Sequence, residues 1–445
     1  MRDLVILLVL AALAWAAFAR AWLGVVALAV VGFLHPQGYA GGFMREFPAY
    51  QAMFAATCAG ALRQAWFEKW RPRLARDWRV GVFGLLWAWF AVTTWQGINP
   101  WAAWPKLLEV AKILPPLVLM WLLIDSREKL GLLLAGIGLS VAAAAVKGGT
   151  WALMTGFHDR VYGPPGSQFE GNNEFAVAVV MAIPLLVLWL REMREAASKW
   201  ALRAVIALCY ASALTSWSRG GLLSLAVVTV LLAWSGRGKL AAAAAIAAGG
   251  VLVLAAFPQE WLGRMATLAA PQSEGSAASR LEIWRIGLAF IAEHPVFGGG
   301  FEGWIYASLA TGGLRDWHNA YIEIAAEHGL PGLALWLALI VGSMLSLGRS
   351  ARGPGGRADA CVMLRASLAG YASGAMFLGI AYWDLAYWLV AAAGLMRAMP
   401  AGGPAGRLSA PDREAWGIPG DTPAAAVSKK LTVGSAAESV RQASH

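Results

Sequence analysis

Charged residues are scarce in this chain of 445 residues: they make up 14% of the sequence, whereas soluble domains carry about 25%. The apolar residues AVILMFWYC make up 59%. They form long unbroken runs rather than the alternating pattern of a membrane β-barrel. These features exclude a soluble globular enzyme, a disordered chain and a collagen-like chain. The sequence therefore predicts an all-α polytopic membrane protein.

Cysteines are also few, and the three present show neither a disulfide pattern nor a metal-binding pattern. Cys58 and Cys209 lie inside apolar runs, Cys361 lies beside a basic loop, and none forms a CxxC pair. Acidic residues are outnumbered by basic ones, which gives a formal net charge of +10. Because the basic residues lie between hydrophobic runs, they indicate membrane topology rather than nucleic-acid binding.

The apolar runs predict the number of spans. A membrane span needs about 20 mostly apolar residues. Ten runs approach this length and three shorter pieces precede them, so we expect about twelve transmembrane helices. The ten runs lie near 80–96, 107–124, 130–147, 174–190, 203–217, 222–234, 240–257, 329–347, 366–380 and 383–398, and the three pieces near 3–19, 21–34 and 48–62.

Loops rich in lysine and arginine predict the orientation. The basic clusters at 63–79, 191–203 and 348–365 fall on one side if the ten later spans alternate, and that side is expected to be cytoplasmic. The long hydrophilic segment then forms a periplasmic loop that contains helices. The predicted organisation is transmembrane helices over 1–257, the periplasmic loop over 258–328, further transmembrane helices over 329–400, and a disordered cytoplasmic tail over 401–445.

A short turn on the outer side holds Arg219, where the positive-inside rule disfavours arginine. Gly220 and Gly221 follow it; glycine permits positive φ and lets backbone N–H groups approach a ligand closely. We interpret Arg219 and Gly220 as an anion contact. The alternative is an interfacial arginine that reaches the lipid headgroups.

A second arginine lies in the predicted periplasmic loop. Ser279 and Glu282 form an S-x-x-E capping box, which predicts a helix over 279–293 with Arg280 in its first turn. A helix N-terminus already favours anions, and the guanidinium adds a forked, permanently charged donor. The alternative is an exposed loop arginine.

A histidine and two asparagines complete the candidate site. His318 and Asn319 lie where the loop returns to the membrane, and Asn173 lies where the outer loop 148–173 enters a span. Histidine is the default general base near neutral pH; the alternative is an interfacial histidine without chemistry. His318 and His328 have no third ligand nearby, so no zinc site is predicted.

Nucleotide chemistry is not indicated, because Gly298-Gly299-Gly300 lacks the Lys and Ser/Thr of a P-loop. The outward segments show no recognisable Asp/Glu cluster. Two arginines and a histidine on one side of the membrane suit a substrate with a phosphate or pyrophosphate and a hydroxyl group to be deprotonated. No nucleotide is expected outside the inner membrane of a bacterium, so the donor should be lipid-linked.

The spacing His318-Asn319-x9-Gly329-x2-Gly332 fits the H-[NSQ]-x9-G-x2-G pattern of the O-antigen ligase family. Three further segments are similar to landmarks of that family, in its order: Asn173-x-Phe175-Ala176, Ser218-Arg219-Gly220 and Arg280-x3-Trp284. The opening segments Met1-Arg2-Asp3-Leu4 and Phe33-Leu34-His35-Pro36-Gln37, with Glu170–Phe175, resemble O-glycosylation ligases associated with exosortase systems, in the same superfamily.

The resemblance implies a GT-C-like membrane glycosyltransferase. It would transfer a glycan from undecaprenyl pyrophosphate to an acceptor at the periplasmic face of the bacterial inner membrane, without a metal ion or another cofactor. In the best-known members the acceptor is the lipid A–core oligosaccharide. Relatives use a second lipid-linked chain, as polymerases do, or a protein hydroxyl, as O-oligosaccharyltransferases do.

The leading hypothesis is therefore an inverting O-antigen ligase. Arg219 and Arg280 would hold the pyrophosphate, and His318 would deprotonate the acceptor hydroxyl. The supporting residues would be Asn319, Asn173, Gly220 and Ser279. A polymerase or a protein ligase with the same donor remains open, and a glycan transporter ranks lower, because its charges should lie within the spans. The sequence does not distinguish the acceptors.

Overall fold

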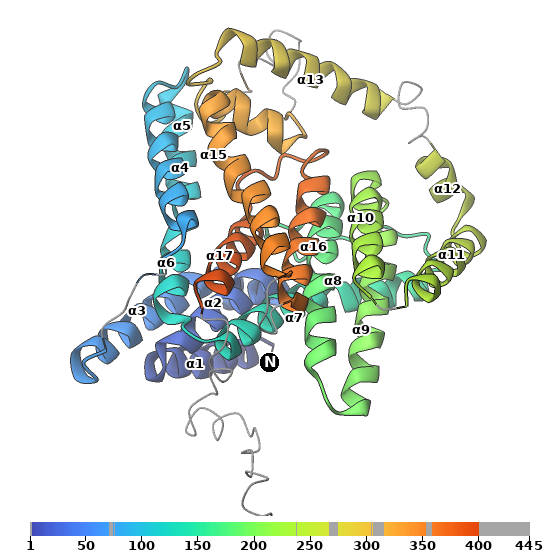
Figure 1. Ribbon diagram of the computed structural model, residues 1–445, viewed down its shortest axis with the longest axis horizontal. Helices are drawn as coiled ribbons and strands as arrows, with labels where there is room; N and C mark the ends of the chain where they lie inside the picture. Colours follow the sequence, from blue (N-terminus) through green and yellow to red (C-terminus); the bar gives the residue numbers. More distant parts are fainter. Residues whose placement is uncertain are drawn as a thin grey trace, which may run out of the picture. The chain divides into compact units, whose positions relative to one another are not determined.

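The computed structural model describes residues 2–70, 74, 76–236, 238–266, 275–303, 305, 316–352 and 358–399. Within these ranges the chain is helical and contains no β-strand (Figure 1). The predicted all-α membrane protein is confirmed. The predicted tail, 401–445, lies outside the described residues.

The helices follow the apolar runs of the sequence. The first part of the chain forms α1 (Arg2–Ala19), α2 (Ala21–Leu34), η1 (Pro36–Tyr39), η2 (Phe43–Arg45), α3 (Ala49–Phe67), α4 (Trp78–Trp95), α5 (Pro100–Ala111), α6 (Leu114–Leu123) and α7 (Arg127–Met154). The second part forms α8 (Asn172–Glu192), α9 (Ala196–Leu214), α10 (Arg219–Ser235), α11 (Lys239–Ala256), α12 (Gln259–Ala266), α13 (Gly275–Glu293), α15 (Ala320–Ser350), α16 (Ala358–Gly374) and α17 (Asp384–Ala398). In the described chain, α1, α7, α8 and α15 are long and apolar enough to cross a membrane. The count of twelve spans stays a prediction.

One predicted span is interrupted. The run 107–124 forms two helices, because α5 ends at Ala111 and α6 begins at Leu114. Pro115 and Pro116 fit the first turn of α6, where a missing N–H costs nothing, but they cannot continue the preceding helix. The break leaves Lys112 at the junction, where it lines a large cavity.

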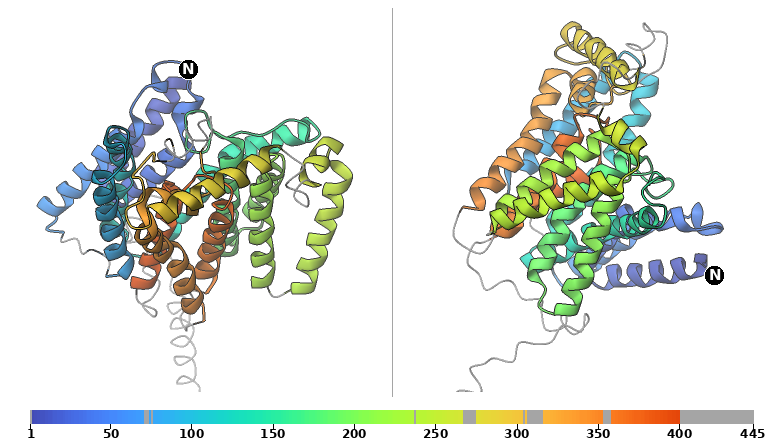
Figure 2. Two further views of the ribbon diagram at one scale, coloured as in Figure 1. Left: turned by 90° about the horizontal axis from the view of Figure 1, so that it is seen from above. Right: turned by 90° about the vertical axis from the view of Figure 1, so that its right-hand side faces the viewer.

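The core is formed by helices that are apolar on all sides. α8 is buried from Phe175 to Leu186, and α17 is buried from Leu385 to Met396. A helix with no polar face must be covered all round. Accordingly, α16 packs on α8 and α10, and α15 packs on α16 and α4 (Figures 1 and 2).

The helix α15 is broken at Gly329, which has φ 66° and ψ −177°. The break frees backbone carbonyls that the loop before α15 takes up. Gly299 N–H donates to the Ala326 carbonyl oxygen at 2.8 Å, and Gly300 N–H donates to that of Glu327 at 2.9 Å. The run Gly298-Gly299-Gly300 thus stabilises the break in α15 through these two hydrogen bonds.

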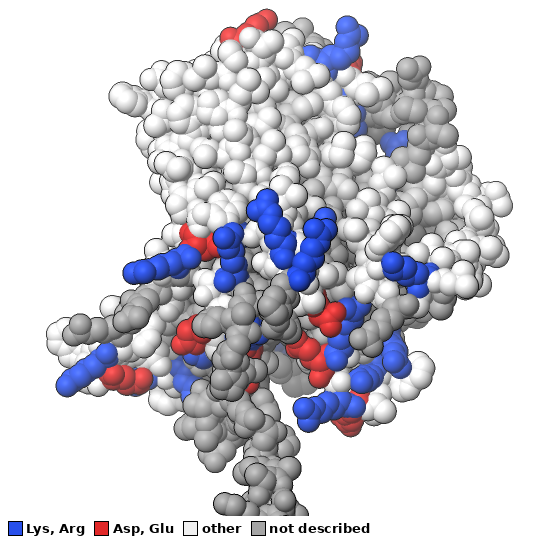
Figure 3. Space-filling view, in the orientation of Figure 1, with Lys and Arg blue, Asp and Glu red and all other residues white. Residues whose placement is uncertain are grey.

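Charged side chains are unevenly distributed over the face shown in Figure 3. Lysine and arginine gather in its lower half, and the middle of the upper half is almost uncharged. The helices α12 and α13 lie at one end of the helix bundle, and α13 packs against α15 (Figures 1 and 2). The assignment of this end to the periplasm stays a prediction.

Candidate functional site

A small pocket lined by three arginines, the arginine pocket, forms where α8, α10, α12 and α13 meet the segment after α16. It is lined by Asn173, Ser218, Arg219, Gly220, Arg264, Arg280, Phe377 and Leu378. The structure therefore brings together four of the candidate residues, which lie far apart in the sequence. It places Asn319, Ser279 and His318 outside this lining.

Arg219 is positioned by the cap of α10. The Ser218 hydroxyl accepts the Gly221 N–H at 3.0 Å, so Arg219 is the first helical residue. The preceding backbone turn is tied to α8, because the Asn172 side chain donates to the Ser216 carbonyl oxygen at 2.7 Å. These bonds set the guanidinium at the helix start, beside Asn173 of α8.

Gly220 and Gly221 do not adopt the positive φ that glycine permits. Both residues are helical, and the left-handed residue of the turn is Trp217, with φ 59°. The glycines are needed for space instead. A Cβ at Gly220 would lie 3.0 Å from Phe377, and one at Gly221 would lie 2.6 Å from Ala176.

The expected capping box at Ser279 is wrong. Helix α13 begins at Gly275, so Ser279 lies inside it and Arg280 lies beyond its first turn. An N-cap residue has non-helical backbone angles, which Ser279 does not have. Small residues before Ser279 extend the helix, and the free N–H groups of its start are therefore not beside Arg280.

Arg264 of α12 is a pocket residue that the sequence analysis missed. Its Nε donates to the Trp217 carbonyl oxygen at 3.2 Å. Trp261, one turn earlier, donates to the Leu214 carbonyl oxygen at 3.0 Å and fixes α12 to the end of α9. The buried residues Trp261 and Met265 are four apart in a short charged segment, and this spacing could have revealed the helix and its inward-facing side.

The arginines are close enough to repel one another. Burial lowers the pKa of Arg280, the charge of Arg264 lowers it further, and the carboxylate of Glu174 raises it. Burial also lowers the pKa of Arg264, as do the charges of Arg160 and Arg219. A bound anion would offset this repulsion, and forked guanidinium groups bind phosphate oxygens in pairs.

His318 lies on a strained turn before α15. Its φ is 47°, which is uncommon for a residue other than glycine. Asn319 caps α15, because its Oδ1 accepts the N–H groups of Tyr321 and Ile322 at 3.0 and 3.2 Å. Ala320 N–H donates to the Ala375 carbonyl oxygen at 2.8 Å. The paired His-Asn motif thus starts the helix and exposes the histidine.

The same turn contacts the elements of the arginine pocket. Trp284 Nε1, one turn after Arg280 in α13, donates to the Trp317 carbonyl oxygen at 2.9 Å. The rings of Trp284 and Phe377 lie 6.4 Å apart. His318 Nδ1 lies 3.8 Å from Asp316, too far for a hydrogen bond. The His318 turn therefore borders the pocket without lining it.

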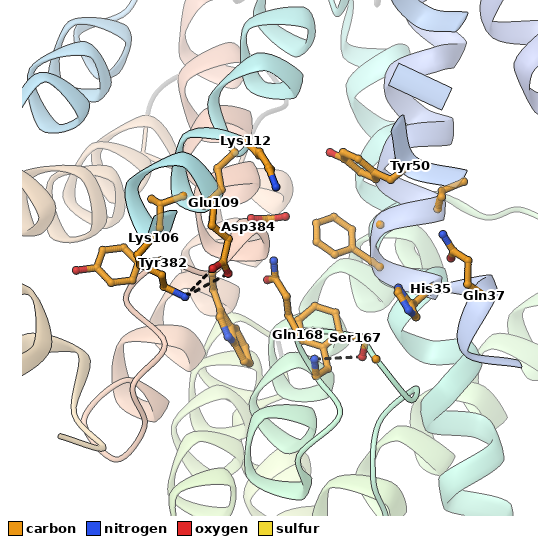
Figure 4. Close-up of a pocket in the computed structure, with 18 of the residues that line it drawn as sticks. His35, Gln37, Tyr50, Lys106, Glu109, Lys112, Ser167, Gln168, Tyr382 and Asp384 are labelled. Atoms are coloured by element: carbon orange, nitrogen blue, oxygen red, sulfur yellow. Dashed lines mark hydrogen bonds and ion pairs between the residues drawn. The ribbon is translucent and has the colours of Figure 1, made fainter. Parts of the chain in front are cut away.

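A larger cavity of about 870 Å³, the carboxyl cavity, also borders this turn, because Asp316 lines it. It is lined by residues within 31–51, 106–113, 166–169, 302–327 and 379–384. Figure 4 shows His35 and Tyr50 on one side and Lys106 and Asp384 on the other. No residue of the candidate site predicted from the sequence lines this cavity.

The carboxyl cavity corrects the view that the outward segments hold no acidic cluster. Glu302, Asp316, Glu323 and Glu327 all line it, although only two of them share a helix. The described residues contain no group of three His, Cys, Asp or Glu side chains arranged to hold a metal ion. The sequence does not reveal this cluster, because Glu302 and Asp316 join the glutamates of α15 only in the folded chain.

One wall of the carboxyl cavity is held by a buried hydrogen-bond chain. His328 lies between Thr93 Oγ1, at 2.7 Å from its Nδ1, and Tyr382 Oη, at 2.8 Å from its Nε2. The Tyr382 hydroxyl donates to Glu327, whose other oxygen accepts the Glu302 N–H at 3.0 Å. Because each member bonds two others, this wall is rigid.

Comparison with known proteins agrees with the motifs. Residues 1–195 match the model of a family of unknown function, and residues 204–337 match the model of the O-antigen ligases. No curated protein matches the chain significantly. The second match includes Arg219, Arg264, Arg280 and the His318 motif. Over residues 204–337 the chain thus belongs to the O-antigen ligase family, as its motifs indicated.

Proposed function

We propose that this protein is an O-antigen ligase that transfers a glycan from undecaprenyl pyrophosphate to a hydroxyl group of the lipid A–core oligosaccharide. The family establishes the broader class, a multi-pass membrane enzyme that joins glycans in ligase or polymerase reactions. The donor, the acceptor, the GT-C-like architecture and the periplasmic location of the site are parts of the proposal.

The observation that carries the proposal is the meeting of Arg219, Arg264 and Arg280 in one pocket. Pyrophosphate offers several oxygens, each able to accept a charge-assisted bond. As the glycan leaves, negative charge grows on the pyrophosphate, and guanidinium groups already in place would stabilise it. In this way the arginines would do the work that a metal ion does in other phosphate chemistry.

His318 is proposed as the general base. It would remove the proton from the acceptor hydroxyl while that oxygen attacks the anomeric carbon and the bond to the pyrophosphate oxygen breaks. Direct displacement inverts the anomeric configuration. The turn that carries His318 borders both the arginine pocket and the carboxyl cavity, so a base there could serve a donor on one side and an acceptor on the other.

The predicted organisation is kept as part of the proposal. Helices α12 and α13 supply Arg264 and Arg280 and belong to segment 258–328. We assign this segment to the periplasmic side, between transmembrane parts 1–257 and 329–400. A lipid-linked donor would then enter from the outer leaflet.

A deletion strain of the source bacterium tests the proposal. Loss of polymer from lipid A–core, with lipid-linked polymer accumulating, is the expected result. Loss of chain extension would indicate a polymerase instead, and loss of a glycoprotein would indicate a protein ligase. Unchanged glycans in all three fractions would contradict a transferase function.

A further inference from the structure

The carboxyl cavity and the arginine pocket share one segment of the chain in their linings, residues 377–379. Phe377 and Leu378 line the pocket, and Gly379 lines the cavity. Asp316, two residues before His318, also lines the cavity. The two segments touch, because a Cβ at Gly379 would lie 2.7 Å from an oxygen of Asp316. A molecule in the cavity would therefore lie next to the proposed base.

The walls of the cavity come from both matched regions. Residues within 31–51, 106–113 and 166–169 belong to the region that matches the family of unknown function. Residues within 302–327 belong to the ligase region. The pocket, by contrast, takes its three arginines from the ligase region alone. The first region thus contributes to the cavity much more than to the pocket.

Carboxyl groups outnumber lysine and arginine side chains in the described lining. Seven carboxyl side chains face three lysine or arginine side chains, and one of these, Lys106, is held by both oxygens of Glu109 at 3.2 Å. Glu323 and Glu327 each accept a backbone N–H group. Hydroxyl and amino groups donate to such oxygens, whereas phosphate offers only further acceptors and negative charge.

The remaining lining suits a sugar. Tyr50 and Trp383 supply aromatic surface, and Gln37, Gln51 and Gln168 supply amides. Such a mixture of aromatic surface and a few convergent polar groups is typical of small-molecule sites, and the volume lies within their range of about 300–1,000 Å³.

We propose that the carboxyl cavity binds the acceptor, as a hydroxyl-rich glycan segment that carries no phosphate or carboxylate, and that the wall from residues 31–51 and 106–113 selects it. This inference rests on the proposed function and narrows it, because a heavily phosphorylated core segment would not fit the cavity. A phosphate next to an ionised carboxylate would be repelled.

Binding without donor tests this inference independently of catalysis. The purified protein in detergent is titrated with chitotetraose and with chitotetraose phosphorylated at its 6-hydroxyl groups, by calorimetry. We expect the neutral sugar to bind at least about tenfold more tightly, since a lost bond to a charged group costs about 1.5–3 kcal/mol. Equal affinity, or tighter binding of the phosphorylated sugar, would overturn the inference.

The KM values of acceptor and donor in a transfer assay then test whether the cavity binds the acceptor or the glycan of the donor. Glu109→Gln and Glu323→Gln each change a lining carboxyl to an amide, and Glu293→Gln makes the same change on the exposed end of α13 as the control. We expect the acceptor KM to rise several-fold in the two cavity variants, with the donor KM unchanged, and neither to change in the control.

A rise in the donor KM alone would assign the cavity to the donor glycan and overturn the inference. If neither sugar binds in the titration, these KM values decide whether the cavity binds the acceptor. Absence of any transfer by the wild-type protein would instead contradict the proposed function, so the two failures are distinguishable.

Discussion

The arginine pocket and the carboxyl cavity are two polar sites of opposite character, and the His318 turn borders both. The pocket is small and lined by three arginines, whereas the cavity is large and carries seven carboxyl groups against three lysine or arginine side chains. Under the proposed function, this difference in charge would separate the anionic leaving group from the hydroxyl-bearing acceptor. His318 would then remove a proton from one substrate as the other loses its pyrophosphate.

The largest effect should come from the residue at the boundary. His318→Ala should reduce transfer by about 10²–10⁴-fold, the usual contribution of a general base. Membrane insertion and thermal stability should stay unchanged, because the side chain is nearly half exposed. A transfer assay in proteoliposomes measures the effect. Near-wild-type transfer by an inserted variant would remove His318 from the mechanism and leave the two sites without a common base.

The pocket should respond next. Arg219→Ala and Arg280→Ala should each lower transfer roughly 10²-fold, because each charge-assisted bond is worth about 1.5–3 kcal/mol and a guanidinium makes two. Lysine at either position should restore only part of the activity, since it cannot pair two oxygens. Arg285→Ala is the matched control, because Arg285 is an exposed residue of α13 outside the pocket. Equal losses in Arg280→Ala and Arg285→Ala would contradict a specific site.

Arg264→Ala should have an intermediate effect, about tenfold. Part of its guanidinium already donates to the Trp217 carbonyl oxygen, so fewer of its donors can reach a phosphate. The donor KM, measured at saturating acceptor, is the informative quantity. An unchanged donor KM would show that Arg264 does not bind the donor, and would leave Arg219 and Arg280 as the arginines that do.

The smallest effect should follow Ser279→Ala. Loss of an N-cap costs about 1 kcal/mol, or roughly fivefold in donor use. Because Ser279 lies inside α13, where alanine is the best helix former, we expect less than about a twofold change. A fivefold loss with unchanged helix content would show that Ser279 acts on the donor after all.

Periodicity and local motifs predicted the helices and most of the polar residues of the arginine pocket. The helices follow the apolar runs. Arg219, Arg280 and Asn173, which the sequence predicts on the outer side of the membrane, line one pocket. The candidate span 107–124 forms two helices, because Pro115 and Pro116 cannot continue α5. The helix start at Ser279 was wrong because a capping box is common and small residues such as Ala277 extend helices equally well.

The carboxyl cavity could not be predicted for a different reason. Its acidic residues come from several distant segments, and Glu302 reaches Glu327 only because segment 298–303 packs at the break at Gly329. Arg264 became a pocket residue only because Trp261 anchors a short helix on α9. Such convergence depends on tertiary contacts, which a single sequence does not contain.

The most direct test of the account is the binding of undecaprenyl pyrophosphate, without a glycan, to the purified protein in EDTA. We expect the wild-type protein to bind it, binding to weaken as the salt concentration rises, and the double variant Arg219→Ala/Arg280→Ala to lose at least about 10²-fold in affinity. Binding that requires added Mg²⁺ or Mn²⁺, or a double variant that binds like the wild type, would contradict the account.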